Sequence, residues 1–179
     1  MKCTLLIPFA LATFLVSCNS SSSKSASNHQ YKYVATDKSY TAEFPAKPTE
    51  HPRSTQTQLG KINYVMVSYQ DNINHRIYST FNMKFPVNPN HFDVEQGLKN
   101  GLEAATKISN STITSENKIT YKSYPGREVT IHFKGSITGK ARLFIDPKGP
   151  TLYQAFAIAK DGNVNSPEIE NFLNSLNIK

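Results

Sequence analysis

Hydrophobic and polar positions alternate with a period of two along much of the chain after residue 30, which is typical of β-strands. Segments rich in aromatic and β-branched residues predict strands at residues 31–34, 40–44, 62–69, 77–85, 129–133, 137–145 and 151–159. The polar residues 36–39 between the first two segments predict a β-hairpin. A further hairpin is predicted from residues 112–114 and 118–122, with its bend at Glu116-Asn117.

The degree of alternation predicts where each strand lies in a sheet. Residues 62–69 and 152–159 carry apolar side chains on both faces, so we expect these strands to be central. Residues 77–85 alternate strictly, which predicts a strand that is buried on one face only.

Proline and glycine mark the predicted loops. Residues 46–60 are polar and contain proline, and we expect a loop there. The Tyr-Pro-Gly sequence at residues 124–126 predicts a turn, as do residues 134–136. Residues 146–150 contain two prolines and a glycine, which predict an obligatory turn.

Two segments show the spacing of three and four residues between apolar positions that is typical of amphipathic helices. Residues 94–108 form the first segment, and Asp93 with Gln96 three residues later resembles an acidic variant of the capping box. Its apolar face is predicted to consist of Val94, Leu98, Leu102, Ala105 and Ile108. The second helix is predicted to follow Ser166 as its cap, with Pro167 in the first position. Its apolar stripe would be Ile169, Phe172, Leu173 and Leu176.

Many strands, hairpin-length links and only two helices predict an α+β fold with a mostly antiparallel central sheet packed by helices. No internal repeat with a fixed period is present. Residues 30–179 have the length of one typical domain.

The first residues have the layout of a secretory signal peptide. Lys2 precedes an apolar run at residues 4–16, which is too short to cross a bilayer, and Ser17 and Cys18 follow. The sequence Leu15-Val16-Ser17-Cys18 resembles the bacterial lipobox. That resemblance implies that residues 1–17 are removed, that the Cys18 thiol receives a diacylglycerol, and that its amino group is acylated, for example with palmitate. The alternatives are an ordinary secreted protein cut near Ser17, or an uncut membrane anchor.

A serine-rich segment follows the lipobox. Residues 19–28 contain no large apolar side chain, so we expect residues 18–29 to form a flexible tether between Cys18 and the folded part. In enteric bacteria an aspartate directly after the lipidated cysteine retains lipoproteins in the inner membrane. Asn19 stands at that position, which favours the outer membrane if the organism has one.

Charge and cysteine content limit the partners and the reactive groups that the folded part can have. The formal net charge is +7, which in an exported protein indicates either attraction to anionic headgroups rather than to nucleic acid, or basic residues spread over a solvated surface for solubility. The two cysteines, Cys3 and Cys18, fall in the leader and at the lipidation position, so the folded part contains no thiol. A group of basic residues lies in the third quarter of the chain, near Tyr121, Tyr124 and Tyr153 in sequence. These residues form either a binding face or an ordinary solvated surface. The group consists of Lys118, Lys122, Arg127, Lys134, Lys140, Arg142 and Lys148.

No catalytic, cofactor or metal signature is present. Ser136 lies in a predicted turn and not in a G-x-S-x-G elbow. The five histidines (His29, His51, His75, His91 and His132) form no i, i+4 pair and no H-E-x-x-H motif. The carboxylates Glu95, Glu103, Glu128, Asp146 and Asp161 are scattered along the chain, so the sequence by itself pairs none of them. We therefore expect no enzyme, no cofactor and no metal site.

The folded part resembles the PsbP-like class of small α/β domains. The resemblance rests on residues 44–48 (Phe-Pro-Ala-Lys-Pro), residues 124–128 (Tyr-Pro-Gly-Arg-Glu), Leu152-Tyr153 and residues 172–176 (Phe-Leu-Asn-Ser-Leu). It implies a central antiparallel sheet between helices, in an α/β/α sandwich. It also implies a role in binding or assembly without a shared catalytic set, so no site residue is carried over.

These observations predict a membrane-anchored lipoprotein of the cell envelope. Its domain would be a non-catalytic module that binds a protein partner or an anionic envelope component. The alternatives are an envelope hydrolase or transferase with a dispersed active site, and a purely structural role in the envelope.

Overall fold

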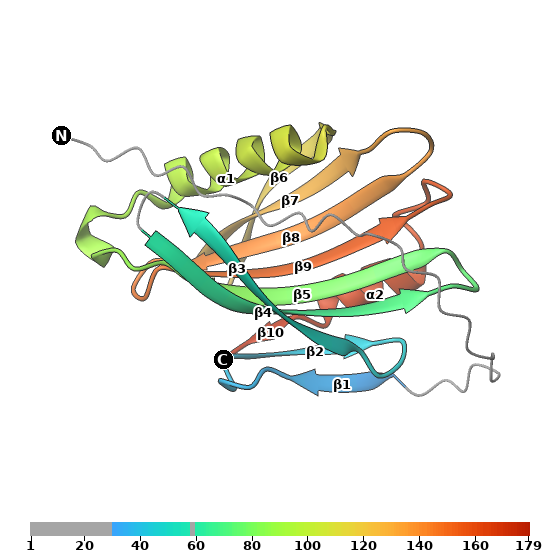
Figure 1. Cartoon of the computed structure of the whole chain (residues 1–179), viewed down its shortest axis with the longest axis horizontal. Coiled ribbons are helices and arrows are strands. Elements are labelled where there is room, and N and C mark those ends of the chain that lie inside the picture. The colour runs from blue at the N-terminus through green and yellow to red at the C-terminus, as the bar shows by residue number, and fades with distance from the viewer. Residues whose placement is uncertain (1–29, 58–59) are drawn as a thin grey trace.

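The computed structural model describes residues 30–57 and 60–179 (Figure 1). The predicted signal peptide at residues 1–17 and the predicted tether at residues 18–29, with Cys18, lie outside the described residues. The main feature is a seven-stranded antiparallel sheet with the order β3-β4-β5-β9-β8-β7-β6. Its strands are β3 (Thr49–Thr57), β4 (Gly60–Asp71), β5 (Arg76–Lys84), β6 (Thr112–Tyr121), β7 (Tyr124–His132), β8 (Thr138–Asp146) and β9 (Thr151–Ala159).

A smaller antiparallel sheet and two α-helices complete the described fold. The small sheet has the order β1-β2-β10, with β1 at Tyr31–Val34, β2 at Tyr40–Phe44 and β10 at Asn177–Ile178. The helices are α1 (Val94–Ser109) and α2 (Pro167–Asn174), and a short 3-10 turn, η1 (Pro89–His91), precedes α1. This arrangement confirms the predicted α+β class with a mostly antiparallel sheet.

The side-chain alternation of β9 separates two cores on the two faces of the large sheet. Ala155, Ala157 and Ala159 face α2 and the small sheet, and their small side chains let the helix approach closely. Leu152 and Phe156 face the opposite core, which contains Leu98 and Leu102 of α1. Every β9 residue except Ile158 is buried, which confirms the predicted central position of this strand.

Both helices begin where the sequence predicts, with differences in the caps. The Asp93 side chain accepts a hydrogen bond from the Gln96 backbone N–H at 3.0 Å, but the Gln96 side chain donates to Asn100 and does not complete the box. Ser166 occupies the cap position of α2, but its side chain makes no capping hydrogen bond. Its hydroxyl instead accepts a hydrogen bond from the Arg76 guanidinium at 2.5 Å.

The predicted apolar faces are largely confirmed. Leu98, Leu102 and Ala105 of α1 are buried, as is the whole predicted stripe of α2. The prediction that Ile108 belongs to the core is wrong, because Ile108 lies in the last turn of α1 and its side chain is 58% exposed.

The predicted loop at residues 46–60 is wrong, because most of it forms the edge strand β3. This strand pairs with β4 alone, and most of its side chains are exposed, so it lacks the hydrophobic alternation of a half-buried strand. Pro52 lies within it, which an edge position allows because one side of the strand needs no N–H donor. The predicted strand at residues 62–69 is confirmed as β4, which lies inside the sheet between β3 and β5.

The predicted hairpin within residues 112–122 is also wrong. Those residues form one strand, β6, with an irregularity in its pairing between Ile113 and Ser115. The turn follows at Lys122, which has a φ of 53°, and residues 124–126 begin β7 instead of forming a turn. The polar side chains along β6 resemble those of a turn, because β6 is the other edge strand of the sheet and most of its side chains are exposed.

Strand β5 is buried on both faces, in contrast to the predicted half-buried strand. Tyr78 and Thr80 are 1% and 0% exposed, although their alternation with the apolar positions predicts a solvated face. The Tyr40 hydroxyl lies 3.1 Å from the Thr80 hydroxyl, so the small sheet covers this face of β5. The two-residue strand β10, which pairs with β2, has no counterpart in the sequence prediction.

Candidate functional site

The basic residues of the third quarter do not gather on one face. Strand register places Lys118 opposite Arg127, on the side of the large sheet that α1 covers. Lys140 and Arg142 alternate with Ala141 and Leu143 and therefore point to the side that α2 covers. Of the two readings left open by the sequence, a single binding face is therefore not supported: Lys118 and Arg127 form one cluster with carboxylates, and Lys140 and Arg142 form another.

The first cluster joins α1 to β6 and β7. Glu95 Oε2 accepts hydrogen bonds from Arg127 Nη2 at 2.6 Å and from Lys118 Nζ at 2.9 Å. Arg127 Nε donates to Glu116 Oε1 at 2.9 Å, and Arg127 Nη1 donates to the Gly126 carbonyl. The Arg127 side chain is only 7% exposed, so its charge requires these partners.

These contacts fix the charges of the first cluster at neutral pH. Hydrogen bonds from Arg127 and then from Lys118 lower the pKa of Glu95 to about 2. Desolvation would lower the pKa of Arg127, but its contacts with Glu95 and Glu116 outweigh this and raise it. A general acid or base needs a pKa near the working pH, so this pair is suited to holding α1 in place and not to proton transfer.

The cluster borders a cavity of about 390 Å³ between α1 and β6. Glu95, Glu116 and Arg127 line it together with Asp93 and Glu103. Glu95 and Glu116 both pair with Arg127, and the Asp93 carboxylate accepts a hydrogen bond from the backbone of α1. These four charged side chains are therefore engaged in holding α1 and its contacts with the sheet.

The second cluster joins α2 to β7 and β8. Arg142 donates from Nε to Glu128 at 2.6 Å and from Nη2 to Glu170 at 2.9 Å. Lys140 Nζ contacts the same two carboxylates, with Glu170 the nearer partner. The four side chains are between 11% and 29% exposed, and each cation bridges both acids. This closed network attaches α2 to the sheet, which is a structural use of the charges.

The tyrosines near these basic residues also serve the fold. The Tyr124 ring lies parallel to the Tyr153 ring at 6.4 Å between centroids. Tyr121 donates to the Asn177 side chain at 2.7 Å, and Lys122 Nζ donates to the Ile178 carbonyl at 2.6 Å. The tip of the β6–β7 hairpin thus holds the C-terminal strand β10 in place.

A polar network that the sequence did not predict connects the small sheet to the large one. The Tyr33 hydroxyl donates to Glu50 at 2.8 Å, and Asn82 donates to Asp37 at 2.7 Å. Burial is the first cause that raises the pKa of Tyr33 and of Tyr40, so both phenols stay neutral. Their partners lie 17 to 45 residues away in sequence, a separation at which no local pattern reveals a contact.

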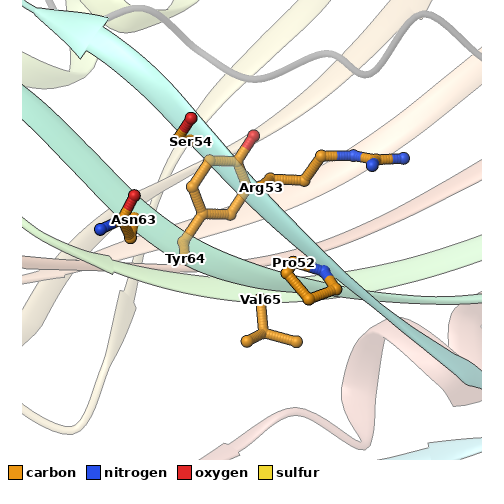
Figure 2. A pocket seen from close by; sticks show the side chains of 6 residues that line it. All are labelled: Pro52, Arg53, Ser54, Asn63, Tyr64 and Val65. Atoms are coloured by element: carbon orange, nitrogen blue, oxygen red, sulfur yellow. The ribbon is translucent and has the colours of Figure 1, made fainter.

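A second hollow of about 460 Å³ lies on the β3–β4 hairpin (Figure 2). Arg53 and Tyr64 pair across the two strands on one face, and Pro52 and Val65 pair on the other. Burial raises the pKa of Tyr64, so the phenol is neutral. Arg53 is the one charged residue among the six that line the hollow, and no carboxylate accompanies it. The hollow therefore contains no acid–base pair.

The remaining candidates are dispersed. Ser136 is exposed in the loop after β7. His51 Nε2 lies 3.1 Å from the Ser68 hydroxyl, whereas His75, His91 and His132 lie in exposed positions elsewhere. Across residues 30–57 and 60–179, no three side chains of His, Cys, Asp or Glu come together as metal ligands would. His29 falls outside the described residues, as does Cys18.

Comparison with known proteins supports the fold. No protein-family model matches the chain, and no curated protein matches it either. Among solved structures, it is similar to the solution structure of cyanobacterial PsbP (CyanoP) from Synechocystis sp. PCC 6803. The TM-score is 0.59 at 9% sequence identity, and the match covers 92% of this chain and 99% of that chain.

The chain therefore has a PsbP-like fold, which confirms the resemblance noted in the sequence. At 9% identity the likeness is one of fold, and it transfers no site residue.

Proposed function

We propose that this protein is a lipid-anchored protein of the cell envelope whose PsbP-like domain acts as a non-catalytic binding or assembly module. The observation that carries the proposal is the order of segments along the chain. A short charged head and an apolar run lead to Leu15-Val16-Ser17-Cys18, a serine-rich segment follows, and the folded domain begins near residue 30.

The anchor would work through two or more acyl chains on Cys18. Each buried methylene group contributes about 0.8 kcal/mol, so one chain binds a membrane only marginally and two hold stably. The described residues include no helix of sufficient length and hydrophobicity to cross a bilayer. A diacylglycerol on Cys18 is a sufficient anchor for the domain.

The chemistry of the domain favours binding over catalysis. In the cavity beside α1, contacts between Glu95 and Arg127 hold both groups in their charged forms. In the hollow on the β3–β4 hairpin, Arg53 has no acidic partner. An envelope hydrolase or transferase would need a group that titrates near neutral pH beside a nucleophile, and neither hollow provides this combination.

A protein partner or an anionic envelope component would be the target of the module. The cell itself provides the direct test: fatty-acid labelling and photo-cross-linking of the native protein, with Cys18→Ser as the test variant and Cys3→Ser as the matched control. We expect the native protein and Cys3→Ser to incorporate palmitate and to yield the same cross-linked partner. We expect Cys18→Ser to incorporate none. Label in Cys18→Ser, or turnover of an envelope substrate by the purified protein, would contradict the proposal.

A further inference from the structure

One end of the large sheet is defined by a row of paired residues. Arg76 pairs with Ala159, Ala159 with Thr138, Thr138 with His132, and His132 with Thr112. Three connections lie beyond this row: residues 72–75, residues 133–137 and residues 160–165. We call this part of the surface, together with the last turn of α1 that leads into β6, the entry end.

The chain enters the fold at this same end. The turn between β1 and β2 lies away from it, because Asp37 in that turn accepts a hydrogen bond from Asn82, six residues along β5 from Arg76. Tyr31, at the start of β1, pairs instead with Phe44. The Phe44 ring is 5.1 Å from Phe172, which is 5.1 Å from Tyr78 near the beginning of β5. Figure 1 shows the start of β1 on the same side as the turn between β4 and β5.

The entry end carries the two most exposed large hydrophobic side chains among the described residues. Ile73, in the turn between β4 and β5, is 70% exposed, and Ile108, in the last turn of α1, is 58% exposed. Nothing in the fold requires an isoleucine at the tip of a turn, where a polar residue avoids the cost of exposed apolar area.

Three lysines lie at the same end. Lys107, Lys134 and Lys160 are exposed, and none of them forms an ion pair with an acid among residues 30–57 and 60–179. The two aspartates at this end are engaged in their own turns. Asp71 accepts hydrogen bonds from the Ile73 and Asn74 backbones, and Asp161 accepts one from the Asn163 backbone. Arg76 and Glu168 pair with each other at 2.9 Å.

We propose that the entry end is a membrane-docking surface, in which Ile73 and Ile108 enter the interfacial region of the bilayer while Lys107, Lys134 and Lys160 contact anionic headgroups. This inference rests on the proposed anchoring through Cys18. Cys18 precedes Gln30 by 12 residues, which span at most about 40 Å, so an anchor there keeps this end close to the bilayer. Apolar side chains flanked by lysine are the combination that an anionic interface binds.

Tethering makes a weak contact sufficient. A short link holds the domain at a millimolar effective concentration relative to the surface, so docking needs little affinity of its own. Full burial of an isoleucine side chain corresponds to a factor of about ten or more in binding, and each lysine near an anionic surface corresponds to about fivefold. Loss of Ile73 therefore reduces the docked population several-fold without affecting the anchor.

The test uses the processed chain that starts at Cys18, with that single thiol coupled to a maleimide lipid in vesicles. All described residues are retained, and the result does not depend on whether cells lipidate Cys18. Backbone hydrogen exchange is measured on vesicles that contain phosphatidylglycerol and on vesicles of phosphatidylcholine alone. We expect protection at residues 72–75, 133–137 and 160–165 on the anionic vesicles. We expect none at residues 147–149, at the opposite end of the sheet.

Matched variants decide the outcome. Ile73→Ser should reduce the protection at least about fivefold, whereas Val34→Ser, at a residue that is 48% exposed on β1, should not. Lys134→Glu combined with Lys160→Glu should reduce it more than tenfold, and Lys148→Glu at the opposite end should not. Equal exchange at both ends, protection of the opposite end, or protection unchanged by Ile73→Ser would overturn the inference. An unmodified Cys18 in cells, with docking intact in this assay, would overturn the proposed function and leave the surface standing.

Discussion

Replacement of Gly126 by alanine tests the packing of β7 against β8 most sharply. A Cβ atom at this position would lie 2.2 Å from the Leu143 carbonyl oxygen and 2.6 Å from Phe144 Cδ1. Ordinary contacts of a Cβ atom begin at 3.4 Å. The nearer obstacle is backbone, so relief requires β7 and β8 to separate by about 1 Å, which is enough to break hydrogen bonds between them.

The expected cost follows from two opposing effects. Overpacking of a well-packed site costs about 1–3 kcal/mol, and a backbone obstacle places Gly126→Ala near the top of that range. Alanine restricts the unfolded chain more than glycine does, which returns about 0.5–1 kcal/mol. The net destabilisation should be about 2 kcal/mol. At a typical urea dependence, this lowers the unfolding midpoint by about 1 M, and it lowers the melting temperature by about 4–8 °C.

Gly149→Ala is the matched control. Its Cβ atom would meet only the Asp146 carboxylate, at 3.4 Å, in the turn between β8 and β9. Its free energy of unfolding should stay within about 0.5 kcal/mol of the native protein. Urea unfolding of both variants, followed by circular dichroism, measures the difference. Equal stability of Gly126→Ala and Gly149→Ala would refute the described packing of β7 on β8.

Three further predictions concern α1, the carboxylate of Glu95 and the cluster at α2. Leu102→Ala removes a side chain that is 2% exposed and should lower the free energy of unfolding, measured by chemical denaturation, by about 2–5 kcal/mol. Ile108→Ala should change it by less than about 0.5 kcal/mol. Equal effects would contradict the described packing of α1 on the sheet. The folded pKa of Glu95 lies near 2, below its unfolded value, so its contribution is full above about pH 4.5 and disappears as the pH falls toward 2. The Glu95 side chain is 54% exposed, so Glu95→Gln should lower the free energy of unfolding by less than about 1 kcal/mol at pH 7 and should have no effect near pH 2. A difference between the thermal melts that does not change with pH would contradict the lowered pKa of Glu95. Glu170→Gln leaves Lys140 and Arg142 with a single carboxylate and should lower the free energy of unfolding by about 1–3 kcal/mol. Glu168→Gln changes a side chain that is 65% exposed and should lower it by less than about 1 kcal/mol. The reverse order would contradict the role of the network.

Local signals were sufficient to predict the elements that bury one clear face. The spacing of Leu98, Leu102 and Ala105 defines α1, and Pro167 marks the start of α2. The apolar run of β9 predicts its central position, because only a strand with cover on both faces carries such a sequence.

The predictions that were wrong have a common physical cause. The burial of a side chain and the pairing of a strand depend on partners that are remote in sequence. The edge strands β3 and β6 are each held by hydrogen bonds to one neighbour. β3 therefore carries mostly polar side chains, and the polar middle of β6 resembles the bend of a hairpin. Tyr78 and Thr80 look solvated until the small sheet covers them. The prediction of Ile108 as a core residue failed because Ile108 lies in the last turn of α1, where its side chain is exposed.

The charged clusters were partly predictable. Glu128 pairs with Arg142 across the β7–β8 hairpin, and the turn at residues 134–136 had been predicted, so the register alone would have brought these two side chains together. Glu95 and Arg127 lie 32 residues apart, on a helix and a strand, and only the packing of α1 on the sheet joins them. A sequence therefore shows which charges exist, but the fold decides which remain free.

The most direct test of the account is the intact mass and the amino-terminal sequence of the protein isolated from the membrane fraction of the cells that make it. The account predicts a chain that starts at Cys18 and exceeds the calculated mass of residues 18–179 by a diacylglycerol and one further acyl group. The account would be contradicted by a chain that starts at another residue, or by an unmodified Cys18 on a protein found in the soluble fraction.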